Sequence, residues 1–263
     1  LKEPDVKITR EEDGKLNLDN WLIKVGALGA KRDTLLPRKT KPFTIDEAVI
    51  QNGSFELYDE FSERFPEELF DYSNFQIKNL TGNLKDFYIH RDTITFHGTS
   101  IRGLEPRSNL AIKNIETDFF YSKKQILLQK LNAEINNSVI HDFIGLYYNK
   151  PSDLNQLISK VIIKANLKNS VFDSKDLGRF ASTMYAYDEL YRIDANLKGH
   201  VNDLYFDNAK INFGKQSFIA GKGNFKGLPN VKETFYHMEV EPSVLEAMDI
   251  KQYAGESNYL RYV

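Results

Sequence analysis

The histidines are the first residues to test for catalytic or metal-binding chemistry. The five are His90, His97, His141, His200 and His237. No two of them show four-residue helix spacing beside a carboxylate, and none belongs to an H-E-x-x-H or H-x-E pattern. His200 lies on the polar face of a predicted strand, where a solvated side chain is expected. The sequence therefore predicts no metal site.

The other residues that could do chemistry also lack a catalytic pattern. Gly221–Gly227 resembles a phosphate-binding loop, but it lacks the Lys-Ser/Thr pair and the following helix of a Walker motif. There is no Gly-x-Ser-x-Gly elbow, and the absence of cysteine excludes disulfides and thiol nucleophiles. Glu67–Glu68 and Glu11–Asp13 are interpreted as solvated surface, although carboxylate pairs can also form only in the fold. We expect no enzyme activity, no catalytic residue and no cofactor.

Charge and hydropathy limit the partners of the chain. Its 263 residues include 35 basic and 37 acidic side chains, which gives a net charge of -2 and a pI near 6.3. This balance provides no basic field, so nucleic acid is not expected as a partner. No run of eighteen apolar residues could cross a bilayer as a helix. Because the chain opens at Leu1, we expect a fragment or processed product whose targeting segment lies upstream.

Alternation of apolar and polar residues is the clearest structural signal. Aromatic residues make up 13% of the chain although its mean hydropathy is -0.47, and aromatics fit the half-buried surface of a sheet. From Tyr191 to Val201 every second residue is apolar or glycine, and the residues between are polar. The same alternation covers residues 161–168 and 234–241. Most of the chain is therefore predicted to form short antiparallel strands with one apolar face.

Turns and a few short helices are predicted between these strands. Glycine and asparagine tolerate positive φ, and they predict turns at 52–53, 81–83, 102–103, 221–223 and 227–230. A capped apolar stripe predicts a short helix from Asp173 to Met184. A second short helix is predicted over Ser152–Ser159, and Phe61–Phe70 is expected to be irregular or helical. None of these helices is long enough to cover a sheet.

A series of one-sided strands must bury its apolar face or use it. The strands can close into a sandwich or a barrel. They can also form an elongated, curled sheet whose apolar inner face stays available to an apolar ligand. The periodicity establishes a mostly β fold and leaves these architectures open.

Five segments, in consistent order along the chain, carry motifs of one family. They are Pro4–Leu18 with Pro-x-Val and Asp-Gly-x-x-Asn-Leu, Pro42–Asp59 with an Asn-Gly turn before an aromatic strand, Asn169–Phe180 with Ser-x-x-Asp-Leu-x-x-Phe, Leu197–Leu204 with Leu-x-Gly-x-Val-x-x-Leu, and Phe225–Val231 with Gly-Leu-Pro. Together they resemble the AsmA/TamB superfamily of bacterial envelope proteins.

The resemblance implies a fold, a location and partners. The family fold is an elongated, curled antiparallel sheet, the β-taco, with a few short helices and a hydrophobic groove that conducts phospholipid between the inner and outer membranes. The resemblance also implies a periplasmic protein with an inner-membrane anchor outside this sequence, and TamB-like members support outer-membrane protein assembly with a BamA-type barrel partner. Residues 1–241 would form the β-groove region, and 242–263 are unassigned and could form a separate segment.

We hypothesise that the apolar faces of the three best strands line this lipid groove. The residues expected to line it are Val161, Ile163, Leu167, Tyr191, Ile193, Ala195, Leu197, Val201, Tyr236, Met238 and Val240. Two alternatives stay open. One is a non-catalytic envelope scaffold that binds an outer-membrane protein complex, and the other is a compact carbohydrate-binding β-sandwich.

Overall fold

The computed structural model describes residues 1–10, 17 and 42–253, without the side chain of residue 252. Twelve strands in these residues form one sheet whose spatial order equals the chain order. They are β1 (Asp5–Thr9), β2 (Phe43–Tyr58), β3 (Phe75–His90), β4 (Thr93–Glu105), β5 (Leu110–Ser122), β6 (Gln125–Ile135), β7 (Ser138–Tyr147), β8 (Ile162–Asp173), β9 (Leu190–His200), β10 (Asp203–Phe213), β11 (Ser217–Lys226) and β12 (Phe235–Val240). β1 runs parallel to β2, and all other neighbours are antiparallel.

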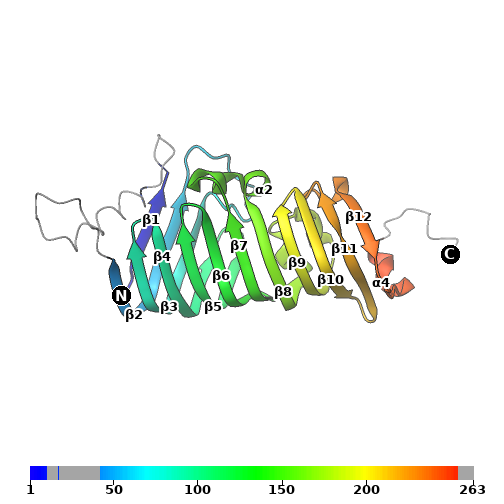
Figure 1. The fold of residues 1–263 in the computed structure, drawn as a ribbon, viewed down its shortest axis with the longest axis horizontal. Helices are drawn as coiled ribbons and strands as arrows, with labels where there is room; N and C mark the ends of the chain where they lie inside the picture. Colours follow the sequence, from blue (N-terminus) through cyan, green and yellow to red (C-terminus); the bar gives the residue numbers. More distant parts are fainter. Residues whose placement is uncertain (11–16, 18–41, 254–263) are drawn as a thin grey trace, which may run out of the picture.

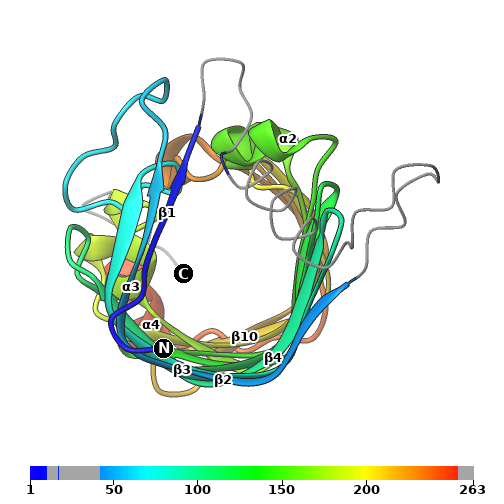
Figure 2. The ribbon, with the colours of Figure 1, turned by 90° about the vertical axis from the view of Figure 1, so that its left-hand side faces the viewer.

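The sheet is a single layer that is long in one direction and curled in the other. Figure 1 shows the strands stacked along the long axis, and Figure 2 shows them curling around an open centre in end view. Twelve strands at a spacing of about 4.8 Å extend over roughly 50 Å. The predicted mostly β, elongated, curled sheet is confirmed. The compact β-sandwich is wrong, because the strands of the described residues form one sheet and not two.

Short helices lie in the connections between strands and after the last strand. They are η1 (Pro151–Gln156) and α2 (Leu157–Lys160) before β8, α3 (Ser174–Gly178) and η2 (Ser182–Ala186) before β9, η3 (Val231–Glu233) before β12, and α4 (Ala247–Ile250) with η4 (Lys251–Tyr253) after it. Both segments predicted to be helical contain helix, but each is divided into two short pieces, α3 with η2 and η1 with α2. The Asp173 carboxylate caps α3 by accepting from Lys175 N at 2.7 Å. Residues 61–70 are irregular. No helix in the described ranges has the length and apolar character needed to span a membrane.

The strands are longer than predicted because most of the predicted turns lie inside strands. The turns expected at 52–53, 81–83, 102–103 and 221–223 are wrong, and only 227–230 connects two strands. Non-glycine residues with positive φ instead mark shifts of strand register. They are Asn52, Asn79, Ser100, Lys130, Asp142, Asn169 and Asn208. Because a bulge adds a residue to one strand and bends it, these bulges let long strands curl.

Asn169 offers a test of this account. Its φ is 48°, it lies at the register shift between Leu167 and Ser170, and its N–H donates to Asp194 Oδ1 at 2.8 Å. Left-handed backbone costs a β-branched residue roughly 1–2 kcal/mol, whereas glycine adopts it freely. We expect Asn169→Val to lower the free energy of unfolding by that amount, and Asn169→Gly to change it by only a few tenths. Urea denaturation of both variants measures this, and equal stability would show that the bulge does not depend on the residue.

The antiparallel order sorts the connections between strands into two rims. The Asp59 rim comprises residues 59–74, 106–109, 136–137, 174–189 and 214–216. The Asn155 rim comprises residues 91–92, 123–124, 148–161, 201–202 and 227–234. In Figure 2, α3 on the Asp59 rim and α2 on the Asn155 rim lie on opposite sides of the open centre.

Candidate functional site

An unbroken row of apolar residues crosses the sheet from β2 to β12. Strand register aligns, as direct neighbours, Phe43, Ile89, Ile94, Tyr121, Ile126, Leu146, Ile163, Gly199, Leu204, Phe225 and Tyr236. A second row aligns Phe96, Phe119, Leu128, Ile144, Ala165, Leu197, Phe206, Gly223 and Met238. Directly opposed residues on neighbouring strands share a face of the sheet. The two rows therefore lie on one continuous face, which we call the apolar face.

The apolar face is the concave side of the curled sheet. Tyr205 is 56% exposed, whereas the next residue, Phe206 on the apolar face, is 5% exposed. Side chains converge on the concave side of a bent single layer and shield one another, whereas on the convex side they diverge. Ring stacking agrees, since the Phe96–Phe119 and Phe206–Phe225 centroids are each 4.6 Å apart.

The apolar face keeps part of its surface accessible. Among the described residues, the largest side chains with less than 2% exposure are Val161, Ser170 and Ser174, none of which belongs to the two rows. A packed core would bury large apolar side chains completely. Within residues 1–10, 17 and 42–253 no second layer of strands covers this face, and its Leu, Ile and Phe side chains are mostly half-buried. An apolar ligand could therefore contact them.

Three polar residues join the two rims across the apolar face. Arg10 Nε lies 2.7 Å from Asp59 Oδ2, Arg10 Nη2 donates to Asn155 Oδ1 at 2.6 Å, and the Asn155 amide donates to the Asp59 carboxylate. The side chains of Arg10 and Asp59 are 7% and 4% exposed. We call these three residues the clasp. Figure 2 shows the upper end of β1 beside the segment that contains α2, at the level where the clasp joins the two rims.

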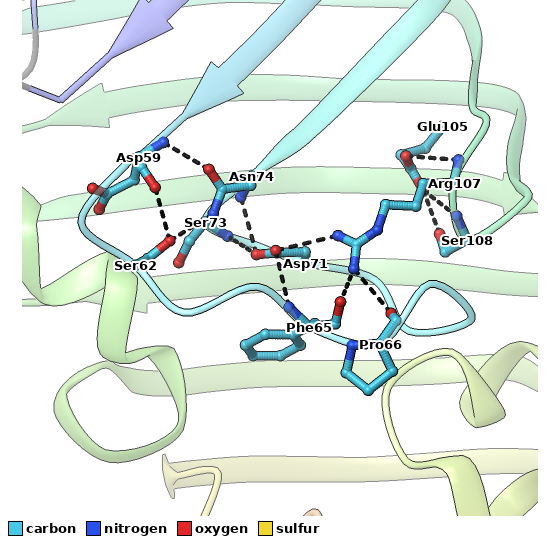
Figure 3. A network of polar contacts seen from close by, with 10 residues as sticks. All are labelled: Asp59, Ser62, Phe65, Pro66, Asp71, Ser73, Asn74, Glu105, Arg107 and Ser108. Carbon is cyan, nitrogen blue, oxygen red and sulfur yellow. Dashed lines mark hydrogen bonds and ion pairs between the residues drawn. The ribbon is translucent and has the colours of Figure 1, made fainter.

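The loop that carries Asp59 is held by its own polar network, shown in Figure 3. Asp71 Oδ1 accepts from the N–H groups of Ser73 and Asn74, both at 3.0 Å. Asp71 Oδ2 lies 3.2 Å from Arg107 Nη1, and Arg107 Nη2 also donates to Pro66 O at 3.0 Å. Asn74 Oδ1 in turn accepts from Asp59 N at 2.8 Å. The Asp59 side of the clasp is therefore fixed by a buried network.

The same loop is joined to the connection between β8 and β9. Phe70 N donates to Arg179 O at 2.8 Å, and the Tyr185 hydroxyl donates to Glu68 O at 3.0 Å. Arg179 pairs with Asp176 at 2.8 Å and donates to Ser108 O at 2.9 Å. The Phe70–Arg179 and Tyr185–Glu68 contacts link residues more than a hundred positions apart in sequence, so they stabilise the curl along the Asp59 rim.

The segment after β12 packs against the same rim. The Tyr253 hydroxyl donates to the Tyr191 hydroxyl at 3.1 Å, and the Tyr253 ring contacts Phe213 edge-on. Burial raises the pKa of both tyrosines. Asp249 accepts from the N–H groups of Lys215 at 3.0 Å and Gln216 at 3.2 Å, which lowers its pKa to about 2. Residues 242–253 thus belong to the end of the sheet, and 254–263 lie outside the described residues.

The histidines contact other groups of the sheet. Lys130 and His97 both pair with Asp118, at 2.9 Å and 2.7 Å, and they lower the pKa of that carboxyl. His200 Nδ1 lies 3.1 Å from Val161 O, so His200 is not simply solvated. Over residues 1–10, 17 and 42–253, no three His, Asp or Glu side chains are placed to hold a metal ion.

Nine of the eleven residues predicted to line a groove lie on the apolar face. They are Ile163, Leu167, Tyr191, Ile193, Ala195, Leu197, Tyr236, Met238 and Val240. Val161 precedes β8 and is 0% exposed, and Val201 lies in the turn after β9. The sequence patterns missed the clasp. Asp59 and Asn155 lie 49 and 145 positions after Arg10, and the three residues belong to no motif.

The chain matches no family model, and no curated protein or solved structure is significantly similar to it. Its class therefore rests on its own geometry. It is a single-layer, elongated β-sheet protein whose concave face is apolar from β2 to β12 and is bridged by a buried polar clasp.

Proposed function

We propose that this protein conducts phospholipid along its apolar face, with the acyl chains on that face and the headgroup toward the open side of the curl. The observation that carries the proposal is the unbroken apolar row from Phe43 to Tyr236. Each CH₂ group removed from water contributes about 0.8 kcal/mol, and the contribution hardly changes from one apolar strand to the next. A lipid can therefore slide along the face, whereas a single deep pocket would hold it.

The clasp supports lengthwise movement at its own level. Arg10, Asp59 and Asn155 join the rims there, so a lipid cannot leave sideways between η1 and the end of β2. The apolar face is continuous from β2 to β12, and the clasp blocks sideways exit near β2. Such a passage is suited to transfer of lipid from one end of the sheet to the other. The protein would thus deliver lipid without any catalytic residue.

The proposal extends to the cellular setting that the motif resemblance implies. An AsmA/TamB-like protein would act in the periplasm of a bacterial envelope, with an inner-membrane anchor in a segment outside this sequence. A BamA-type outer-membrane barrel would be its protein partner. The resemblance rests on short motifs, and the one from Glu11 to Leu18 falls almost entirely outside the described residues.

Photo-crosslinking from two adjacent residues tests lipid contact. Leu197 lies on the apolar face and Lys198 on the convex face. We expect a photoreactive residue at 197 to form a lipid adduct in phospholipid-containing extracts, detected by mass spectrometry, and the same residue at 198 to form none. The two residues are neighbours on β9, so they lie on opposite faces of the sheet at nearly the same distance from the strand ends. Adducts from 198 and none from 197 would refute the proposal.

A scaffold role is the second candidate, because β12 at the edge of the sheet is apolar and exposed. Phe235 is 79% exposed, Tyr236 56% and Val240 62%. An exposed edge strand can pair with a strand of another protein. Crosslinks from these positions to polypeptide, together with no lipid adduct at Leu197, would favour this role.

A further inference from the structure

The two rims carry opposite charge. The connections of the Asp59 rim contain nine acidic and five basic residues, whereas those of the Asn155 rim contain six basic and three acidic residues. The basic residues of the Asn155 rim are Arg91, Lys123, Lys124, Lys150, Lys160 and Lys232. Successive connections of this antiparallel sheet lie at opposite ends of the strands, so every second connection lies on the same rim. The segregation of charge therefore places a positive line along one side of a chain whose net charge is only -2.

The cations of the Asn155 rim lie at the surface. All six residues are exposed, and Lys124 Nζ donates to Asn149 O at 2.6 Å. In the described part of the chain, no ion pair joins Arg91, Lys124, Lys150, Lys160 or Lys232 to a carboxylate. By contrast, Arg107 and Arg179 on the Asp59 rim are paired with Asp71 and Asp176.

One of the three acidic residues on the Asn155 rim is turned inward. Asp153 is 5% exposed, and its Oδ2 accepts from the N–H groups of Asn149 and Lys150, both at 3.0 Å. Its charge is therefore met by the backbone of the loop. The surface that a partner would contact is more positive than the composition of the rim alone indicates.

The Asn155 rim also presents an exposed aromatic side chain. Phe235 begins β12 at this rim, is 79% exposed, and lies three residues after Lys232. Lysines beside aromatic residues are typical of surfaces that bind at a membrane interface, where the ring enters the headgroup region and the ammonium group meets phosphate. A nucleic acid offers phosphate but no comparable apolar layer for this ring.

We propose that the Asn155 rim docks on the surface of a bilayer containing anionic lipid, with the acidic Asp59 rim turned away. Like-charge repulsion between the Asp59 rim and the anionic headgroups orients the protein. The open side of the curl would then lie beside the headgroups. This proposal stands on charge and exposure and does not need the lipid conduit, because a scaffold could dock in the same way.

Vesicle co-sedimentation of the full chain tests the proposal. We expect binding to vesicles of phosphatidylcholine mixed with phosphatidylglycerol, weaker binding as salt is raised, and little binding to phosphatidylcholine alone. The triple variant Lys150→Gln, Lys160→Gln, Lys232→Gln should bind roughly a hundredfold more weakly, since each lysine near an anionic surface contributes about 1 kcal/mol, or about fivefold.

A matched triple variant separates the rim from total charge. Lys85→Gln, Lys113→Gln and Lys198→Gln remove the same three charges from exposed strand positions that are not in the Asn155 rim. We expect this variant to keep near-normal vesicle binding. Equal loss in both triple variants would overturn the proposal, and so would binding to soluble polyphosphate as strong as binding to anionic vesicles. Lipid adducts at position 197 would be unaffected by either result, so the two proposals fail separately.

Discussion

Replacing Leu197 by aspartate is expected to lower phospholipid binding and transfer by roughly a hundredfold. Leu197 lies in the second apolar row, opposite Ala165 on one side and Phe206 on the other. A carboxylate placed among acyl chains costs about 3 kcal/mol, which corresponds to roughly a hundredfold in affinity. Transfer of fluorescent phospholipid between donor and acceptor vesicles measures the loss. The same charge at Lys198, on the convex face, should leave transfer nearly unchanged.

The fold of the Leu197→Asp variant must be followed in the same experiment. Leu197 packs against the cluster of Ala195, Phe206 and Ala209, so a loss of stability is also expected. Val240→Asp provides a second position on the apolar face, on the edge strand β12, where the side chain is 62% exposed and its replacement disturbs less packing. Transfer lost in both variants while circular dichroism stays native would support the conduit. If both variants unfold, the apolar face is an ordinary core and the proposal loses its basis.

The sequence predicted the faces of the strands better than their ends. Alternation at Tyr191 to Leu197 correctly placed these residues on one face, because side chains on a strand point alternately to its two sides. The turn prediction at Asn52 was wrong because residues that favour positive φ serve bulges as well as turns. Local composition cannot tell these two uses apart. Such a residue forms a bulge when the chain pairs with a neighbouring strand both before and after it, and a turn when the chain reverses direction there.

The rims and the clasp depend on topology that no local pattern contains. The basic turns at Lys123-Lys124 and Lys150 look like ordinary surface until the strand order brings them to the same rim. Arg10 and Asn155 are separated by 145 positions. Their meeting follows from the curl, which is the summed effect of the bulges.

The structure combines an apolar inner face with rims of opposite charge, and these features divide the proposed work between them. The apolar rows would carry the acyl chains, and the Asn155 rim would set the protein against a charged surface. In the part of the chain that the structure describes, the clasp joins the two rims at one level, near the end of β2. Closure therefore depends on few residues, and a single substitution can test it.

Removing the Asp59 side chain is expected to lower the free energy of unfolding by about 3–5 kcal/mol, because it breaks a buried ion pair with the Arg10 guanidinium. Urea denaturation measures this loss. Glu60→Ala, one residue further along, removes an exposed carboxylate and should change stability by less than about 0.5 kcal/mol. Equal effects of Asp59→Ala and Glu60→Ala would contradict the clasp.

Asn155 distinguishes closure of the rims from support of the loop. Asp59 also accepts from Phe61 N at 3.0 Å, so Asp59→Ala disturbs its own loop as well as the clasp. Asn155→Ala removes only the contacts from the other rim and should cost about 1.5–3 kcal/mol, because the hydrogen bonds of Asn155 to the charged Arg10 and Asp59 are lost. Amide hydrogen exchange should then accelerate in η1 and stay unchanged at Ser73 and Asn74, which the Asp71 network holds. Faster exchange at both places would mean that Asn155 supports the loop and does not act as a separate bridge between the rims.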